Sequence, residues 1–529
     1  MNPRLAALTL SAASVLALSS CSSARDVNDA GWQHPTLDAK SYYDDYQEAA
    51  DDNVVLGSAP GTAAGSGSSD EQPPEPGLLE DNTFVDAGTS GFVNASTDPL
   101  STFALDVDTG SFSVARTLLA AGVRPPRASI RPEEWVNAFD YHQPAPTDSD
   151  LGIAVDQMPA PGLSDGTQLI RVGVKAREIA ADERPPVALT VVVDTSGSMD
   201  IRERLGLVKS SLALLAEHLR PADTVAVVTY EDNARPVLAP TPVRDTEAIV
   251  QAIDNLRPGG STNLEAGLRL GYREARTAYR PDAVNAVILA SDGVANVGMT
   301  GPDALARMIT QGDQDGIHLV TVGYGMGNYN DDLMEQLADQ GNGFYAYVDT
   351  FAEAEHLFVD ELSSTLTPVA KDAKVQVEFD PAAVSSYRLI GYDNRALEDG
   401  DFVDDSVDAG ELGAGHDATA LYEVTLAEGA SPDAALGEVA VRWESVETGA
   451  IEEVHETLYA ADAETEPSNE TQLASTAADF AQLLKGSAPL EGREIDLGVL
   501  AQRASDLEAE GVDGAAELHA LIVQAQTAR

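Results

Sequence analysis

Residues 186–367 alternate continuous apolar runs with amphipathic stretches, and this alternation constrains the fold more than any other feature of the chain. A strand that is apolar at every position is buried on both faces, which is typical of a parallel sheet covered by helices on each side. We therefore predict a doubly wound α/β domain here. Its strands are expected at 187–193, 224–229, 286–290, 317–322 and, more weakly, 344–348. Its helices are expected at 205–219, 246–256, 264–278, 303–311, 331–340 and 351–366.

Polar side chains stand in three loops between these elements. Asp194, Ser196 and Ser198 follow the first strand, Thr262 precedes the helix that opens at 264, and Asp292 follows the strand at 286–290. Ligands of doubly wound sheets bind beyond the carboxyl ends of the strands, so we expect these five side chains to converge. Three hydroxyls and two carboxylates suit a hard divalent cation such as Mg²⁺. The set contains neither nitrogen nor sulfur, which argues against zinc.

Residues 187–367 resemble a von Willebrand factor type A domain. The run Asp194-x-Ser196-x-Ser198 is similar to the first element of the metal-ion-dependent adhesion site of that family, Thr262 to the second and Asp292 to the third. The resemblance implies that the two serines bind the metal directly and that Thr262 binds it directly or through water. It also implies that the aspartates act mainly through water and that the metal is Mg²⁺, or Mn²⁺ or Ca²⁺.

The flanks of this domain also carry a resemblance. Residues 98–146, 325–332 and 369–426 are similar to segments found with this domain in a widespread group of bacterial lipoproteins. Alternating strand patterns within 151–180 and 369–445 are typical of antiparallel sheets with one wet face. We expect these strands to pair in a β domain into which the central domain is inserted. Apolar residues at spacings of three and four then predict helices in the last segment.

The first 21 residues resemble a bacterial lipoprotein signal peptide. Arg4 precedes an apolar run at 5–18, which is shorter than the roughly 20 residues that span a bilayer and reads as a secretory signal. Small residues stand directly before Cys21, the one cysteine of the chain, as in a lipobox. We therefore expect lipidation at Cys21 and an extracytoplasmic protein held by lipid on the cell membrane or the outer membrane. An ordinary signal peptide with an incidental cysteine is the alternative.

The predicted organisation has six parts. Residues 22–97 are rich in acidic residues, Gly, Ser and Pro, and we expect a disordered tether because such a composition buries little apolar surface. The parts are a signal peptide (1–21), the tether (22–97), an N-terminal flanking segment (98–185), the α/β domain (186–367), a C-terminal β segment (368–465) and a helical tail (466–529).

Charge and cysteine content exclude several classes of function. The chain has 32 Lys and Arg against 87 Asp and Glu, a net charge of −55. Nucleic-acid binders need basic surface to release counterions, so no nucleic acid is expected as a partner. A single cysteine permits neither an internal disulfide nor a cysteine-rich metal site.

Because hydroxyl ligands are neutral, a cation bound by them keeps much of its positive charge. It also keeps a coordination position that faces outward and holds only water, and a carboxylate of a partner can displace that water. Because the three loops hold no histidine, we expect binding rather than hydrolysis and no enzymatic activity. The interpretation is a metal-dependent adhesion or assembly module whose protein partner offers an Asp or Glu. The alternative is an envelope scaffold with a structural or idle metal site. A more remote one is an aspartic-type protease, suggested by Asp106-x-Asp108-Thr-Gly and Asp194-Thr-Ser-Gly.

Overall fold

The computed structural model describes eleven stretches of the chain. They are residues 37–47, 84–105, 107–162, 167–180, 183–293, 302–325, 331–360, 367–431, 434–461, 467–486 and 495–529. The signal peptide with Cys21, most of the predicted tether and Asp106 lie outside the described residues. Within these stretches, no helix combines the length and the apolar character needed to cross a membrane.

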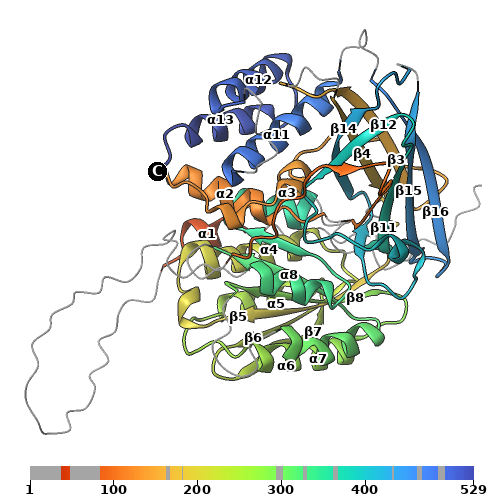
Figure 1. Cartoon of the computed structure of the whole chain (residues 1–529). Coiled ribbons are helices and arrows are strands. Elements are labelled where there is room, and N and C mark those ends of the chain that lie inside the picture. Colours follow the sequence, from red (N-terminus) through yellow and green to blue (C-terminus); the bar gives the residue numbers. More distant parts are fainter. Residues whose placement is uncertain are drawn as a thin grey trace, which may run out of the picture. The chain divides into compact units, whose positions relative to one another are not determined.

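The central domain is built on a six-stranded sheet in the order β10-β9-β8-β5-β6-β7 (Figure 1). Neighbouring strands are parallel except at one edge, where β7 runs antiparallel to β6. The strands are β5 (Val187–Asp194), β6 (Thr224–Tyr230), β7 (Ala234–Pro242), β8 (Val284–Ser291), β9 (His318–Tyr324) and β10 (Tyr345–Val348). The predicted doubly wound sheet is confirmed. The sequence prediction missed β7, whose three prolines are tolerated because it is an edge strand.

The helices of this domain follow the strands as the apolar periodicity predicts. They are α4 (Leu207–His218), α5 (Thr246–Asp254), α6 (Leu264–Ala278), α7 (Pro302–Gln314), α8 (Asp331–Asp339) and α9 (Phe351–Glu355). Two segments differ from the regular helices expected there, because π-helical turns lie before α4 (Arg202–Gly206) and after α9 (His356–Asp360). Such turns are rare in proteins, and those that occur often lie at functional sites.

Two glycines let α6 approach the sheet closely. A Cβ added at Gly271 would lie 2.3 Å from Val192 Cγ2, and one added at Gly267 would lie 2.5 Å from Tyr230 Cδ1. Non-bonded carbon atoms do not approach each other this closely, so only glycine fits at either position. The loop that carries Thr262 leads directly into this helix, and its place above the sheet therefore depends on the close packing.

The flanking segments form two antiparallel sheets, and strands from both sides of the central domain share them. One sheet has the order β1-β12-β14-β4-β3, and the other has β13-β11-β15-β16 with β2 also paired to β11. The strands before the insertion are β1 (Val93–Asn94), β2 (Leu100–Ala104), β3 (Leu151–Pro159) and β4 (Thr167–Ala176). Those after it are β11 (Pro368–Phe379), β12 (Val384–Ile390), β13 (Gly410–Gly413), β14 (Asp417–Leu426), β15 (Ala435–Ser445) and β16 (Ile451–Tyr459).

The pairing of β4 with β14 and of β2 with β11 joins segments separated by the whole α/β domain. This matches the predicted antiparallel β domain with an inserted α/β domain. Inward side chains of the two sheets form one apolar cluster that includes Val172, Val375, Tyr422 and Trp443.

Five helices pack together beside the first of these sheets, where α3 and α11 contact its strands and α12 and α13 lie on α11 (Figure 1). They are α2 (Gly110–Ala120), α3 (Pro132–Asn137), α11 (Asn469–Lys485), α12 (Leu497–Glu510) and α13 (Ala515–Ala525). The buried Trp135 of α3 packs edge-on against Phe480 of α11, with ring centroids 5.2 Å apart. The helical C-terminal tail is therefore integrated with the N-terminal flank.

Two parts of the predicted tether lie against the folded domains instead of forming the flexible coil expected there. Residues 37–47 contain a short helix, α1 (Ser41–Asp44), which contacts α4. Residues 93–94 form β1, which pairs with β12. Three tyrosines explain why residues 37–47 pack against the domain. Tyr42, Tyr43 and Tyr46 supply the apolar surface that the acidic composition otherwise lacks.

Candidate metal centre

The three predicted loops lie at one edge of the central sheet. Asp194 ends β5, and Asp292 follows β8, the strand paired in parallel beside it. The loop before α6 closes on the first loop, since Gly259 donates its amide to the Thr195 carbonyl (2.8 Å) and Gly197 donates its amide to the Gly260 carbonyl (3.2 Å). The fold thus brings together the loops that carry all five predicted residues, because β5 lies between β6 and β8.

Asp194 is completely buried and is held by three donors. The Ser196 amide donates to its Oδ1 (2.8 Å), while the hydroxyls of Ser291 (2.9 Å) and Tyr230 (3.2 Å) donate to its Oδ2. Tyr230 ends β6 and packs under Gly267, so neighbouring strands and α6 all fix the position of this carboxylate.

The two serines form the outer part of the site. Their Oγ atoms lie 3.0 Å apart and share a hydrogen bond. Ser196 is 2% exposed, whereas Ser198 is half-buried in the 3₁₀ turn Gly197–Met199. Thr262 is 4% exposed. The hydroxyl of Ser198 therefore lies nearest to solvent in the first loop, and the carboxylates lie below.

A basic side chain that the sequence prediction missed completes the arrangement. Arg204 lies in the π-helical turn and is 6% exposed. Its Nη1 donates to Asp292 Oδ2 (2.9 Å) and to the carbonyl oxygen of Ser198 (2.6 Å). The guanidinium thus bridges the first loop and the third and offsets the charge of one of the two aspartates.

Comparisons with known proteins agree with this geometry. The family model described as "von Willebrand factor type A domain" matches residues 188–360. The chain contains a von Willebrand factor type A domain. A model described as "von Willebrand factor" matches residues 79–171, and one described as "Uncharacterized protein YfbK, C-terminal" matches residues 364–527.

Two relatives are similar to parts of the chain. Over 337 residues the chain is 41% identical to "Uncharacterized protein YfbK" of Escherichia coli, an alignment that covers 62% of this chain and 58% of that protein. Over 210 residues it is 31% identical to "Uncharacterized protein sll0103" of Synechocystis, covering 40% of this chain and 49% of that protein. The matches thus span about half of the length of these relatives.

A solved structure, "von Willebrand factor type A from Catenulispora acidiphila", is similar at 17% identity with a TM-score of 0.42. That similarity covers 68% of this chain and 88% of the other.

The residues of the type A domain fit a divalent cation. Two carboxylates are buried close enough to interact, at 0% and 1% exposure, and the converging loops also carry the buried Ser196 and Thr262 and the half-buried Ser198. Burial raises the pKa of Asp194 to about 7, and the negative charge of the neighbouring Asp292 is the second largest cause of this shift. Two carboxylates that oppose each other's ionisation in this way would be stabilised by a nearby cation. Ser196, Ser198 and Thr262 would hold it, and Asp194 and Asp292 would support it from below.

The raised pKa predicts that cation binding depends on pH. Below about pH 7 the cation-free site carries a proton on Asp194 that binding must release, whereas above pH 7 it carries none. The affinity for Mg²⁺ should therefore be about tenfold weaker at pH 6 than at pH 8. Calorimetric titrations at the two pH values measure this, and equal affinities would show that Asp194 is already ionised at pH 6.

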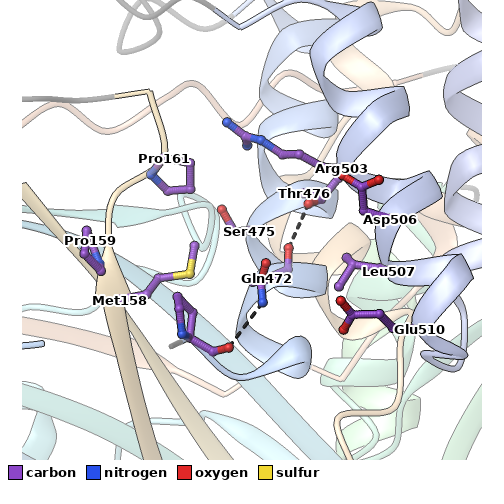
Figure 2. Close-up of a pocket in the computed structure, with 11 residues that line it drawn as sticks. Met158, Pro159, Pro161, Gln472, Ser475, Thr476, Arg503, Asp506, Leu507 and Glu510 are labelled. Atoms are coloured by element: carbon purple, nitrogen blue, oxygen red, sulfur yellow. Dashed lines mark hydrogen bonds between the residues drawn. The ribbon is translucent and has the colours of Figure 1, made fainter. Parts of the chain in front are cut away.

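Two further features lie outside the metal loops. Asp372, Asp408 and Glu411 bring one carboxylate oxygen each within 4.8 Å of one another, and burial raises the pKa of Glu411 well above its ordinary value. A pocket lies between β3 and the helices α11 and α12 (Figure 2). Its lining mixes apolar, polar and charged side chains, including Met158, Pro161, Gln472, Thr476, Arg503 and Glu510. None of the predicted metal residues lines it, so it belongs to the flanking domain alone.

Proposed function

We propose that the type A domain binds a divalent cation, with Mg²⁺ as the expected ion, and through it a carboxylate of a protein partner. The observation that carries the proposal is the convergence of the three loops, with two buried carboxylates, the buried Ser196 and Thr262, and the half-buried Ser198 nearest to solvent. A bound divalent cation would supply a positive charge with a water-held position facing outward. The three hydroxyls would orient it without neutralising it, and Asp194 fixes the first loop by accepting the Ser196 amide.

Binding is favoured over catalysis by the same residues. The described groups around the site are hydroxyls, carboxylates and the Arg204 guanidinium. The guanidinium is a poor general base because it stays protonated. The two carboxylates are buried and already engaged, Asp194 by three donors and Asp292 by Arg204. We therefore propose that the protein is not an enzyme. For the protease alternative, Asp108 forms an ion pair with Arg395 (3.5 Å), a cation that opposes sharing a proton with a second carboxylate.

The test uses Mn²⁺ as a probe of the outward water. Protein loaded with Mn²⁺ should enhance water-proton relaxation, and tens of millimolar acetate should reduce that enhancement by displacing the water. The matched variant Ser198→Ala should show neither effect. If Mn²⁺ binds but acetate changes nothing, the scaffold with a structural metal becomes the better account.

We further propose that Cys21 is lipidated and holds the protein outside the cytoplasm on a bacterial membrane. The support is the short apolar run followed by small residues and the single cysteine. In cells fed labelled palmitate, the full-length protein should be labelled and recovered with membranes. The variant Cys21→Ser should be unlabelled and released, and labelling that persists in it would refute the lipobox.

A further inference from the structure

Residues 37–47 cross the surface of the type A domain beside the metal loops. Here we call them the strap. Its helix α1 contacts α4 and the π-helical turn Arg202–Gly206 (Figure 1). Within the strap Ala39 is buried, and Leu37, Tyr42, Tyr43 and Tyr46 are half-buried. These contacts hold the strap against the domain, although it lies more than 150 residues earlier in the chain.

Specific polar contacts fix the register of the strap. The Leu37 amide donates to Glu217 Oε1 on α4, and the Tyr42 hydroxyl donates to Asp254 Oδ1 (3.1 Å). The Arg202 guanidinium lies 4.7 Å from the centre of the Tyr43 ring. Contacts at both ends of the strap and in its middle therefore select one position on the surface.

Tyr46 connects the strap to the end of the first metal loop and to the π-helical turn that follows it. Its hydroxyl donates to Asp200 Oδ1 (2.9 Å), two residues after Ser198. Its ring covers Gly206 so closely that a Cβ added there would lie 3.3 Å from Tyr46 Cγ. The strap thus contacts the end of the metal loop and both ends of the π-helical turn that carries Arg204.

Arg204 is the group through which these contacts reach the metal centre. Its guanidinium bonds Asp292 and the Ser198 carbonyl, and so it places a positive charge beside the carboxylates that a cation would use. Charge repulsion between the guanidinium and a divalent cation opposes loading unless the turn shifts. Contacts that hold the turn therefore oppose loading as well.

We propose that the strap restrains the metal centre by holding the π-helical turn where Arg204 engages Asp292. This inference rests on the proposed metal-dependent function. Binding free energies are reciprocal, so a strap that weakens cation binding must itself be loosened by the cation to the same extent. The type A domain would then exist in a strapped state of low cation affinity and a released state of higher affinity.

The experiment compares the full-length protein with the double variant Tyr43→Ala/Tyr46→Ala by calorimetric titration with Mn²⁺. Both tyrosines are half-buried on the surface, and circular dichroism checks that the variant is folded. We expect the variant to bind Mn²⁺ at least threefold more tightly. The control Tyr459→Ala removes a 50% exposed tyrosine from β16 and should bind as the wild type does.

Hydrogen exchange gives the reciprocal measurement. In the wild type, saturating Mn²⁺ should speed amide exchange within residues 37–47, and it should leave β16 unchanged. Equal or weaker Mn²⁺ affinity in the double variant, or unchanged exchange in the strap, would overturn the inference while the metal centre stands. Absence of Mn²⁺ binding in every variant and the wild type would overturn the proposed function, and the strap inference with it.

Discussion

Replacing Glu423 with alanine should lower the free energy of unfolding by about 3 to 5 kcal/mol, the usual cost of leaving a buried charge without its partner. Glu423 is 0% and Arg388 1% exposed, on the paired strands β14 and β12. Arg388 donates to Glu423 Oε2 through Nε (2.9 Å) and Nη2 (2.6 Å), and to Gln482 Oε1 of α11 (2.9 Å). The alanine variant would leave the guanidinium under the helix without the carboxylate that it hydrogen-bonds.

Urea denaturation of the variant measures this loss. The double variant Arg388→Met/Glu423→Leu is the control, because it removes both charges and keeps apolar volume, and it should recover most of the stability. A loss below about 1 kcal/mol in Glu423→Ala would mean that water reaches the guanidinium and that α11 is not closely docked on the sheet.

Replacing Asp194 with alanine should have two effects, one with the cation and one without it. With a dissociation constant of about 0.1 mM, 1 mM Mg²⁺ stabilises the wild type by about 1.4 kcal/mol, and the variant should lose this gain completely. The cation-free variant should also be less stable, since Tyr230, Ser291 and the Ser196 amide lose their acceptor. Each unsatisfied buried donor costs about 1 to 3 kcal/mol.

Ser198→Ala separates the two effects. Its hydroxyl is half-buried and shares a hydrogen bond with Ser196, so the variant should lose the gain from Mg²⁺ at little cost to the cation-free protein. Thermal melting with 1 mM Mg²⁺ and with EDTA measures both variants. A wild type whose melting temperature does not respond to Mg²⁺ would favour the scaffold with an idle site.

The parts of the fold that sequence predicted best are those in which local pattern and global environment agree. β5 and β8 are apolar at almost every position because both of their faces are covered, and a strand with one wet face would alternate instead. The meeting of the loops at 194–198 and 292 followed from the parallel order, since the carboxyl ends of neighbouring parallel strands lie at one edge. The loop at 259–262 joins α5 to α6 and reaches the same edge through the close packing of α6. The pairing of strands across the insertion was also predictable from their alternation.

The features that sequence missed depend on contacts between distant residues. Nothing in the run 202–206 indicates a π-helical turn, or that Arg204 points back to Asp292. The tyrosines of the strap stand in an acidic segment whose composition predicts coil, and their partners lie on α4, on α5 and in the π-helical turn. β7 carries three prolines, which predict a loop, and only its place at the edge of the sheet makes a strand possible there.

The most direct test of the metal centre is a crystal structure of the full-length protein grown with Mn²⁺, with anomalous scattering used to locate the ion. We expect an anomalous peak beside the hydroxyls of Ser196, Ser198 and Thr262, and its loss in crystals of Ser198→Ala. A peak at Asp372, Asp408 and Glu411 with none at the type A loops, or no peak at all, would contradict it.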